Sequence, residues 1–352
     1  MSPANPRILF VANAGTQVGG GHVMRCLTLA RALSEGGARC VFAATPEVSA
    51  LLAIFGPGMD QEHATSLTPD ALVDTVTGVE FDAVVFDHYG LGRAEHLTLA
   101  DGRPTLVIDD LADRPLGADL VLDSGPDRRA LDYTLFVDGA ARLLLGPDFA
   151  PVRPEFTALR ADALNRRGGP VNRILVALGL TDVGGLTAKV VDRLRPRLGS
   201  AGLDVVLGGQ ASSLKALSRI AAHDPRLTLH VDTTDMAQLT YEADIAIGAA
   251  GSTVWERCTL GLASALIVVA ENQRAAARAL GAREAALVLD AADDNFEHAL
   301  DRALVRLLAD APLRARLTAA SAQLCDGLGA VRVADAFLDL IRGGATEGKT
   351  LG

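Results

Sequence analysis

A glycine-rich loop carrying a histidine follows the first apolar run of the chain. Residues 8–11 (ILFV) read as a strand, and residues 22–33 place apolar side chains at helical spacing, so Gly20, Gly21 and His22 lie where a strand turns into a helix. Glycines allow close backbone approach to a ligand and leave N–H groups free at the helix start. The positive end of the helix dipole there disfavours imidazolium, which suits His22 as a general base. The alternative is a histidine that only caps the helix or packs the loop.

A second polar cluster ends the strongly apolar strand expected at residues 83–86. Asp87, His88 and Tyr89 follow one another there, and burying three polar side chains is costly unless they meet a ligand or one another. Asp87 or His88 would orient His22, and Tyr89 would hold a sugar or polarise a water molecule. The alternative is an aspartate that caps the next turn and a tyrosine that lines the core. For the carboxylates of residues 108–113 (IDDLAD), we favour turn capping.

The second half of the chain contains a candidate phosphate-binding turn. Residues 245–247 read as a strand, residues 248–252 are small, and a helix is expected from Thr253. Backbone amides would converge on a phosphate near Gly251, Ser252 and Thr253, and Glu256, one turn into the helix, could accept hydrogen bonds from a ribose diol. The alternative is a capping box in which Ser252 or Thr253 serves only the helix.

Two further strand ends carry polar groups. Asn272 and Gln273 follow an apolar strand and offer amides suited to sugar hydroxyls or an acetamido group. The turn around Gly179 and Thr181 could line a diphosphate. For both segments an ordinary solvated loop is the alternative. An NAD site is not expected, because Met24 stands where a dinucleotide fingerprint needs its last glycine.

Composition excludes several classes of protein. The 352 residues carry a formal charge of −10, which gives no positive field for nucleic acid. The most apolar stretch, residues 262–270, is about half of the roughly 20 residues that a spanning helix needs, and the first residues lack a secretory pattern. We therefore expect no membrane association and a cytoplasmic location. The four cysteines have no CxxC spacing, so neither a metal site nor a disulfide framework is expected.

Apolar runs alternate with amphipathic stretches along the whole chain, which is typical of βα repeats and parallel sheets. Strands are expected at 8–11, 39–43, 83–86, 105–108 and 120–122, and then at 174–177, 203–207, 227–231, 245–247, 265–269 and near 287. Periodicity fails between residues 146 and 171, where three prolines precede residue 155. We therefore expect an α/β fold with two doubly wound domains, residues 1–155 and 171–342, a linker at 156–170 and a disordered tail at 343–352. The site should occupy a cleft between the carboxyl ends of both sheets, and we expect a monomer with interdomain motion.

Five motifs together resemble the UDP-sugar hydrolases of pseudaminic acid biosynthesis, enzymes of the GT-B type related to the MurG glycosyltransferases. The motifs are GGGHVMRCLTL at 19–29, DHYGL at 87–91, LLGPDFAPVRPEF at 144–156, GAAGSTVWERC at 248–258 and AENQ at 270–273. The resemblance covers most of residues 7–340 and implies two Rossmann-like domains.

The resemblance implies hydrolysis of UDP-2,4-diacetamido-2,4,6-trideoxy-β-L-altropyranose to UDP and free sugar, without metal or cofactor, for a nonulosonic acid of flagellin or surface glycans. The family's base falls on His22, and Tyr89 and Asp87 complete the candidate catalytic set. Substrate contacts are expected from Gly20, Gly21, Arg25, His88, Gly179, Thr181, Gly251, Ser252, Thr253, Glu256, Asn272 and Gln273.

The alternatives are a GT-B glycosyltransferase that uses a UDP-sugar donor and an inactive nucleotide-sugar binding protein. The family's usual Arg and Asp before the glycines correspond here to Val11 and Asn13, which favours the second alternative.

Overall fold

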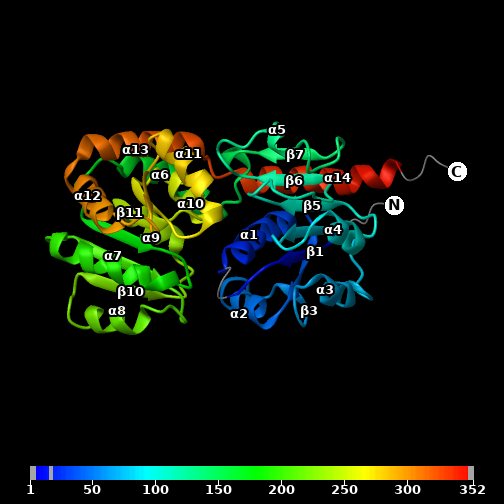
Figure 1. Ribbon diagram of the computed structural model, residues 1–352, viewed down its shortest axis with the longest axis horizontal. Coiled ribbons are helices and arrows are strands. Elements are labelled where there is room, and N and C mark those ends of the chain that lie inside the picture. Colours follow the sequence, from blue (N-terminus) through cyan, green and yellow to red (C-terminus); the bar gives the residue numbers. More distant parts are fainter. Residues whose placement is uncertain (1–4, 16–18, 348–352) are drawn as a thin grey trace. The chain divides into compact units, whose positions relative to one another are not determined.

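The computed structural model describes residues 5–15 and 19–347 and divides the chain into two compact units. Unit 1 runs to Pro151 and resumes at Leu328, and unit 2 runs from Val152 to Gly327. Each unit is built on one parallel sheet with helices on both faces (Figure 1). Among the described residues, no helix combines the length and the apolar character that crossing a membrane would take.

The sheet of unit 1 has the strand order β3-β2-β1-β4-β5-β6-β7, with every neighbouring pair parallel. Its central strands are buried almost throughout because they are mostly apolar, as parallel strands covered on both faces require, with Arg7, Asp87 and Thr105 at strand ends. The strands are Arg7–Ala12 (β1), Arg39–Ala44 (β2), Asp60–His63 (β3), Ala83–Asp87 (β4), Thr105–Ile108 (β5), Leu120–Asp123 (β6) and Arg142–Leu145 (β7). The helices are Gly21–Glu35 (α1), Pro46–Phe55 (α2), Pro69–Val76 (α3), Arg93–Ala100 (α4), Ala130–Tyr133 (α5), Pro147–Phe149 (η1) and Gly329–Glu347 (α14).

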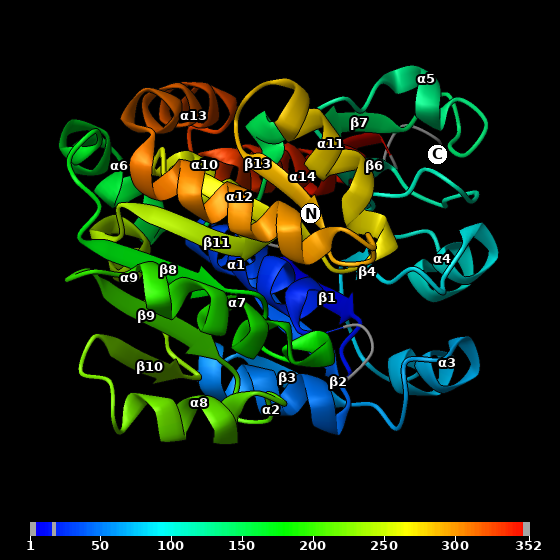
Figure 2. The ribbon, with the colours of Figure 1, turned by 60° about the vertical axis from the view of Figure 1, so that its left-hand side comes forward.

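The sheet of unit 2 has the order β10-β9-β8-β11-β12-β13 and is also parallel throughout. Figure 2 shows α7 and α12 in front of this sheet. The strands are Arg173–Ala177 (β8), Gly202–Leu207 (β9), Leu227–Val231 (β10), Ile245–Ala249 (β11), Ser264–Val268 (β12) and Leu287–Asp290 (β13). The helices are Pro154–Arg166 (α6), Leu186–Leu194 (α7), Leu214–Ala221 (α8), Met236–Glu242 (α9), Thr253–Thr259 (α10), Arg274–Ala282 (α11), Phe296–Ala309 (α12) and Ala311–Leu324 (α13), with short 3₁₀ turns at Val183–Gly185 (η2), Arg195–Arg197 (η3) and Glu271–Gln273 (η4).

The predicted fold class is confirmed, and every strand expected from the sequence is present. Two edge strands were not predicted. β3 has the sequence Asp-Gln-Glu-His and is mostly exposed, and β7 begins at an exposed arginine. Edge strands pair on one side only, so they lack the continuous apolar run by which central strands are recognised.

The expected linker at 156–170 is wrong, because its first part is helix α6. Pro154 occupies the first turn of α6, where a missing N–H is tolerated. The last of the three prolines therefore starts this helix and does not interrupt it. Phe156 and Ala163 are the residues that α6 buries.

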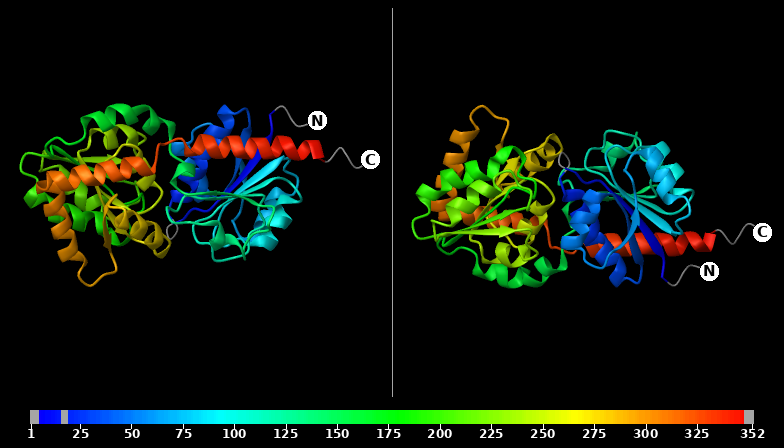
Figure 3. Two further views of the ribbon diagram at one scale, coloured as in Figure 1. Left: turned by 90° about the horizontal axis from the view of Figure 1, so that it is seen from above. Right: turned by 90° about the horizontal axis from the view of Figure 1, so that it is seen from below.

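The expected end of the second domain at residue 342 is also wrong. Helix α14 belongs to unit 1 and packs against α1 (red and blue in Figure 3). It buries Val333, Phe337 and Leu338, and Gly36 provides the space for Leu338, whose Cδ1 lies 2.4 Å from where a Cβ on Gly36 would be. The expected disordered tail at 343–352 is wrong for residues 343–347, which continue α14, and residues 348–352 lie outside the described part of the chain.

Candidate active site

The predicted site residues of unit 1 gather where the strand order of the sheet reverses. β1 and β4 are neighbours in the sheet although β2 and β3 separate them in sequence, and Ala12 pairs with Asp87 at their carboxyl ends. In such sheets the connections after the two strands run to opposite faces, which leaves room for a ligand at the carboxyl ends of the strands. His22 and the segment 87–89 therefore meet at this point.

His22 and Asp87 form a buried pair. His22 is the second residue of α1, Asp87 is the last residue of β4, and His22 Nδ1 lies 2.5 Å from Asp87 Oδ1. Because a carboxylate only accepts hydrogen bonds, the pairing assigns the proton to Nδ1. Nδ1 also lies 3.2 Å from Arg25 Nη2, which can only donate, but the shorter contact to the carboxylate decides where the proton sits. Nε2 is therefore the nitrogen that keeps a lone pair, as a general base requires.

Arg25, which lies on the same helix as His22, holds the carboxylate of Asp87 in place. Its Nε and Nη2 donate to the two carboxylate oxygens at 2.6 and 2.7 Å, and its Nη1 donates to Asp110 at 2.9 Å. Burial alone would raise the pKa of Asp87, but the charges of Arg25 and His22 outweigh it and hold that pKa well below its usual range. The guanidinium of Arg25, expected to bind substrate, is thus engaged by two carboxylates.

Tyr89 completes this cluster. Its hydroxyl donates to Asp110 at 2.5 Å, and its ring meets the His22 ring edge-on with centroids 4.7 Å apart. Burial, together with the carboxylate of Asp110, raises the pKa of Tyr89, so the phenol stays protonated at neutral pH. Tyr89 can therefore restrict the rotation of the imidazole and present a neutral edge to a ligand.

His88 does not orient His22. Its Nδ1 accepts the N–H of Gly90 at 3.1 Å, within its own turn. Burial and the nearby His22 lower the pKa of His88. Of the two candidate orienting groups, the structure selects Asp87.

Asp110 is the residue of this cluster that the sequence interpretation missed. Asp109 behaves as expected for a turn cap, accepting the N–H groups of Leu111 and Ala112. Asp110 instead bonds Arg25 and Tyr89. Two adjacent aspartates at a strand end were the available signal, since consecutive side chains point in different directions and cannot both cap one turn.

In unit 2 the predicted turn lies at the corresponding reversal, between β8 and β11. Ser252 precedes α10 but its hydroxyl makes no cap hydrogen bond, so the capping-box alternative is not formed. Arg257 lies under this turn, where its Nη2 donates to Ala249 O at 2.6 Å and its Nη1 to Thr253 Oγ1 at 3.2 Å. A Cβ on Gly248 would fall 2.5 Å from Arg257 Nη1, so a larger residue at that position would displace the guanidinium.

The other predicted residues of unit 2 surround this turn. Glu256 Oε1 accepts from Arg153 Nε at 2.7 Å, so one of its oxygens is already bonded. Gln273 Oε1 accepts the N–H of Val269 at 3.0 Å, and its Nε2 would lie 3.7 Å from a Cβ on Gly251. Asn272 precedes Gln273 on η4. The amide side chain of Gln273 is therefore bonded at the end of β12 and lies near the Gly251 turn.

The turn that contains Gly179 and Thr181 is less suited to an anion. Asp182, in a left-handed conformation with φ of 48°, accepts the N–H groups of Thr187 and Ser213. A phosphate at the start of α7 would meet this carboxylate instead of free amides. Of the two turns predicted to bind phosphate, the Gly251 turn is therefore the better candidate.

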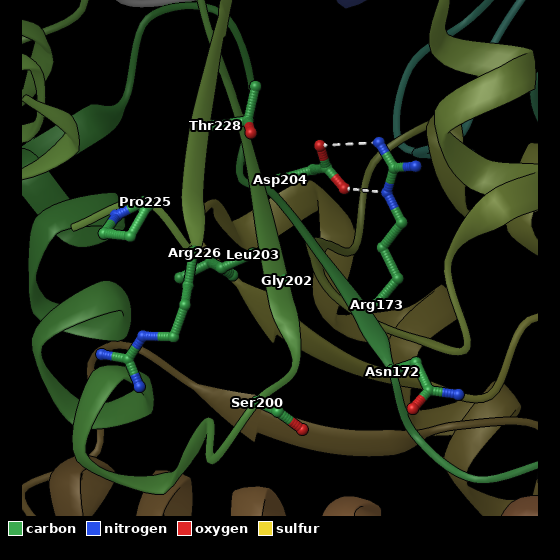
Figure 4. A pocket seen from close by; sticks show the side chains of 9 residues that line it. All are labelled: Asn172, Arg173, Ser200, Gly202, Leu203, Asp204, Pro225, Arg226 and Thr228. Atoms are coloured by element: carbon green, nitrogen blue, oxygen red, sulfur yellow. Dashed lines mark hydrogen bonds and ion pairs between the residues drawn. The ribbon is translucent and has the colours of Figure 1, made fainter.

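A cavity of about 350 Å³ lies at the other end of the same sheet (Figure 4). It is lined by the amino-terminal residues of β8, β9 and β10. Asp204 there bonds Arg173 and His230, while Arg226 is paired with Asp224. These charges are satisfied within the protein, and the cavity lies away from the strand-order reversal.

The two parallel α/β units define a GT-B fold, the architecture of a large class of glycosyltransferases. MurG of Acinetobacter baumannii superimposes with a TM-score of 0.63 at 20% identity, covering 95% of this chain and 99% of MurG. A Staphylococcus aureus MnaA–UDP co-structure superimposes with a TM-score of 0.65 at 14% identity, covering 96% and 98%.

Curated relatives are also found by sequence. The chain is 28% identical over 345 residues to the spore coat polysaccharide biosynthesis protein SpsG of Bacillus subtilis, covering 94% of this chain and 97% of SpsG. It is 24% identical over 273 residues to the UDP-2,4-diacetamido-2,4,6-trideoxy-beta-L-altropyranose hydrolase of Campylobacter jejuni, covering 77% and 94%. No family model matches the chain.

Proposed function

We propose that this protein hydrolyses a UDP-linked sugar to UDP and the free sugar. The observation that carries the proposal is the buried His22–Asp87 pair, whose geometry assigns the lone pair to His22 Nε2. Such a nitrogen, near the carboxyl ends of β1 and β4, suits the activation of a water molecule. Similarity to the C. jejuni hydrolase supports the same reaction class.

In the proposed reaction His22 Nε2 takes a proton from water while the water oxygen bonds to the anomeric carbon. The bond from that carbon to the phosphate oxygen breaks, and UDP leaves with the electron pair. Asp87 stabilises the imidazolium that forms, and Arg25 with Asp110 holds Asp87 in place. The imidazolium then releases its proton to solvent, which returns His22 to its starting state.

The proposed substrate is UDP-2,4-diacetamido-2,4,6-trideoxy-β-L-altropyranose, with UDP held by the Gly251, Ser252 and Thr253 turn of unit 2. Glu256 would accept a ribose hydroxyl, and the amides of Asn272 and Gln273 would bond acetamido groups. The free sugar would serve pseudaminic acid synthesis for flagellin or surface glycans.

The test is to incubate the protein with this UDP-sugar in the absence of an acceptor and to follow the release of UDP by NMR. His22→Asn should lose at least about 10²-fold in turnover, since general base catalysis typically contributes about 10²–10⁴-fold, while UDP affinity stays nearly unchanged. His63→Asn is the matched control, because His63 is an exposed histidine on the edge strand β3. Unchanged turnover in the His22 variant would show that the base is assigned wrongly.

A glycosyltransferase is the second candidate, because the fold is shared with glycosyltransferases such as MurG and the spinosyn forosaminyltransferase SpnP. It predicts no UDP release until an acceptor hydroxyl is supplied. An inactive binding protein predicts UDP-sugar binding and no product with or without acceptor.

A further inference from the structure

Arg257 is a buried cation directly beneath the predicted phosphate turn. Its residue is 4% exposed, and its guanidinium bonds Ala249 O and Thr253 Oγ1, one at each end of the turn. Its Nε is buried and has no hydrogen-bond partner among the described residues. The side chain is therefore committed to the turn but incompletely satisfied there.

The charge of Arg257 is only partly offset by its neighbours, of which Glu256 is the acidic one. The nearest acidic residue in sequence, Glu256, is paired with Arg153, and within residues 5–15 and 19–347 Arg257 forms no ion pair. Burial lowers the pKa of Arg257 to about 10, which still leaves the group charged at neutral pH. A buried charge without a partner is strongly destabilising, so its retention calls for an explanation.

The half-buried Arg160 and the buried Arg314 of unit 2 show how such a charge is normally accommodated. Arg160 bonds the carbonyls of Thr259 and Ala322, in the last turns of α10 and α13, and Arg314 bonds carbonyls in the last turn of α12. Helix carboxyl ends carry partial negative charge that offsets a cation. Arg257 belongs to the last turn of α10, but its guanidinium reaches back to Thr253, the first residue of that helix, where the unpaired backbone groups are N–H donors.

We propose that Arg257 is a positioning residue for a nucleoside diphosphate, and that the missing counter-charge is the diphosphate itself. This rests on the proposed function, in which the Gly251 turn holds UDP. The bond from Nη1 to Thr253 Oγ1 uses a lone pair of the hydroxyl, so the Thr253 hydrogen is left to donate to a phosphate oxygen. Donation by the guanidinium also polarises that hydroxyl and strengthens its own donation. Arg257 thus acts through Thr253 and through its charge, without touching the ligand.

The test compares UDP with uridine by calorimetry. Arg257→Gln removes the charge, and Arg257→Lys keeps it. Arg314→Gln is the matched control, a buried arginine of the same unit that also has no carboxylate partner within the described part of the chain. In Arg257→Gln we expect UDP affinity to fall by roughly ten- to a hundredfold, because the turn loses a positive charge and the polarisation of the Thr253 hydroxyl, with uridine affinity unchanged. The Lys variant should lose less. Arg314→Gln should lower the melting temperature and leave the UDP-to-uridine ratio intact.

A second readout is the melting temperature without ligand. If the charge awaits an anion, Arg257→Gln should melt no lower than the wild-type protein while losing most of the UDP-induced rise. An equal loss of UDP and uridine affinity, or an unchanged ratio of the two, would overturn the inference. Should the Gln variant not fold, the structural role alone explains Arg257, unless Thr253→Val lowers UDP affinity and spares uridine. If the wild-type protein binds UDP no better than uridine, the inference and the UDP site both fail, whereas UDP binding that Arg257→Gln leaves intact removes the inference alone.

Discussion

Replacing Asp87 with Asn is the most informative single change. Both carboxylate oxygens accept hydrogen bonds, Oδ1 from His22 Nδ1 and Arg25 Nη2, and Oδ2 from Arg25 Nε. An asparagine must place its NH₂ at one of these positions. Either orientation therefore sets a donor against Arg25, so neither restores the original network.

The two orientations have different consequences for His22. With the NH₂ at the Oδ1 position, Nδ1 can become an acceptor, which moves the proton to Nε2 and removes the lone pair needed by a base. With the NH₂ at the Oδ2 position the tautomer is kept, but the negative charge that stabilises imidazolium is gone. We therefore expect turnover to fall by about 10²–10⁴-fold, in the range found when a base loses its orienting carboxylate.

The same change should also lower stability. Arg25 keeps its contact to Asp110, so the loss should lie near the lower end of the 3–5 kcal/mol typical of a broken buried pair, at about 3 kcal/mol. For a unit of this size that corresponds to a melting temperature lower by roughly 6–12 °C. Calorimetry and UDP release should be measured on the same preparation, below the lowered melting temperature.

The control is Asp138→Asn, which breaks the exposed Arg93–Asp138 pair of the same unit. It should change neither turnover nor melting temperature. NMR of the His22 ring nitrogens reports the tautomer directly. Turnover above about a tenth of the wild-type value, with the proton still on Nδ1, would refute the reasoning that Asp87 orients a base.

Three further changes test other parts of the structure. Burial lowers the pKa of His96 to about 4, so as the pH falls the unfolded chain takes up a proton at this histidine before the folded protein does. The free energy of unfolding should therefore drop by up to about 1.4 kcal/mol per pH unit between roughly pH 6.5 and 4. In acid melting curves His96→Gln should flatten this slope, and an unchanged slope would exclude His96 as its source. Glu256→Ala should weaken uridine binding about tenfold by removing an acceptor for ribose, as calorimetry can check, and equal uridine affinity would remove Glu256 from the ribose site. Phe337→Ala, at a fully buried position of α14, should cost unit 1 about 3–5 kcal/mol in thermal unfolding, and a loss confined to unit 2 would contradict the assignment of α14.

Strand positions were predictable because parallel central strands are buried on both faces and so are apolar without interruption. Residues 83–86 and 174–177 are clear cases, and both lie at the centre of their sheets. The limits of α6 and α14 were not predictable in the same way. Pro154 reads equally as a helix start or a break, and nothing in the local pattern of α14 shows that it packs on α1 instead of on its sequence neighbours.

The candidate site was predictable where chemistry is concentrated in one segment. His22 stood out at a glycine-rich helix start and Asp87 and Tyr89 at a strand end, and the structure brings them together. Asp110 and Arg257 were missed because their roles depend on residues that are distant in sequence or on the fold of a turn. A guanidinium that fills the space of a missing Cβ at Gly248 leaves no periodic trace in the sequence.

The return of α14 to unit 1 has a consequence for synthesis of the chain. Unit 2 is continuous, from Val152 to Gly327, and can complete its core as soon as those residues have left the ribosome. Unit 1 is begun first but needs the contacts of α1 with α14, which is translated after all of unit 2. Unit 1, which carries His22 and Asp87, is therefore the last to be completed. A chain whose synthesis stops before α14 would contain the proposed nucleotide turn of unit 2 but would lack the helix that packs on α1.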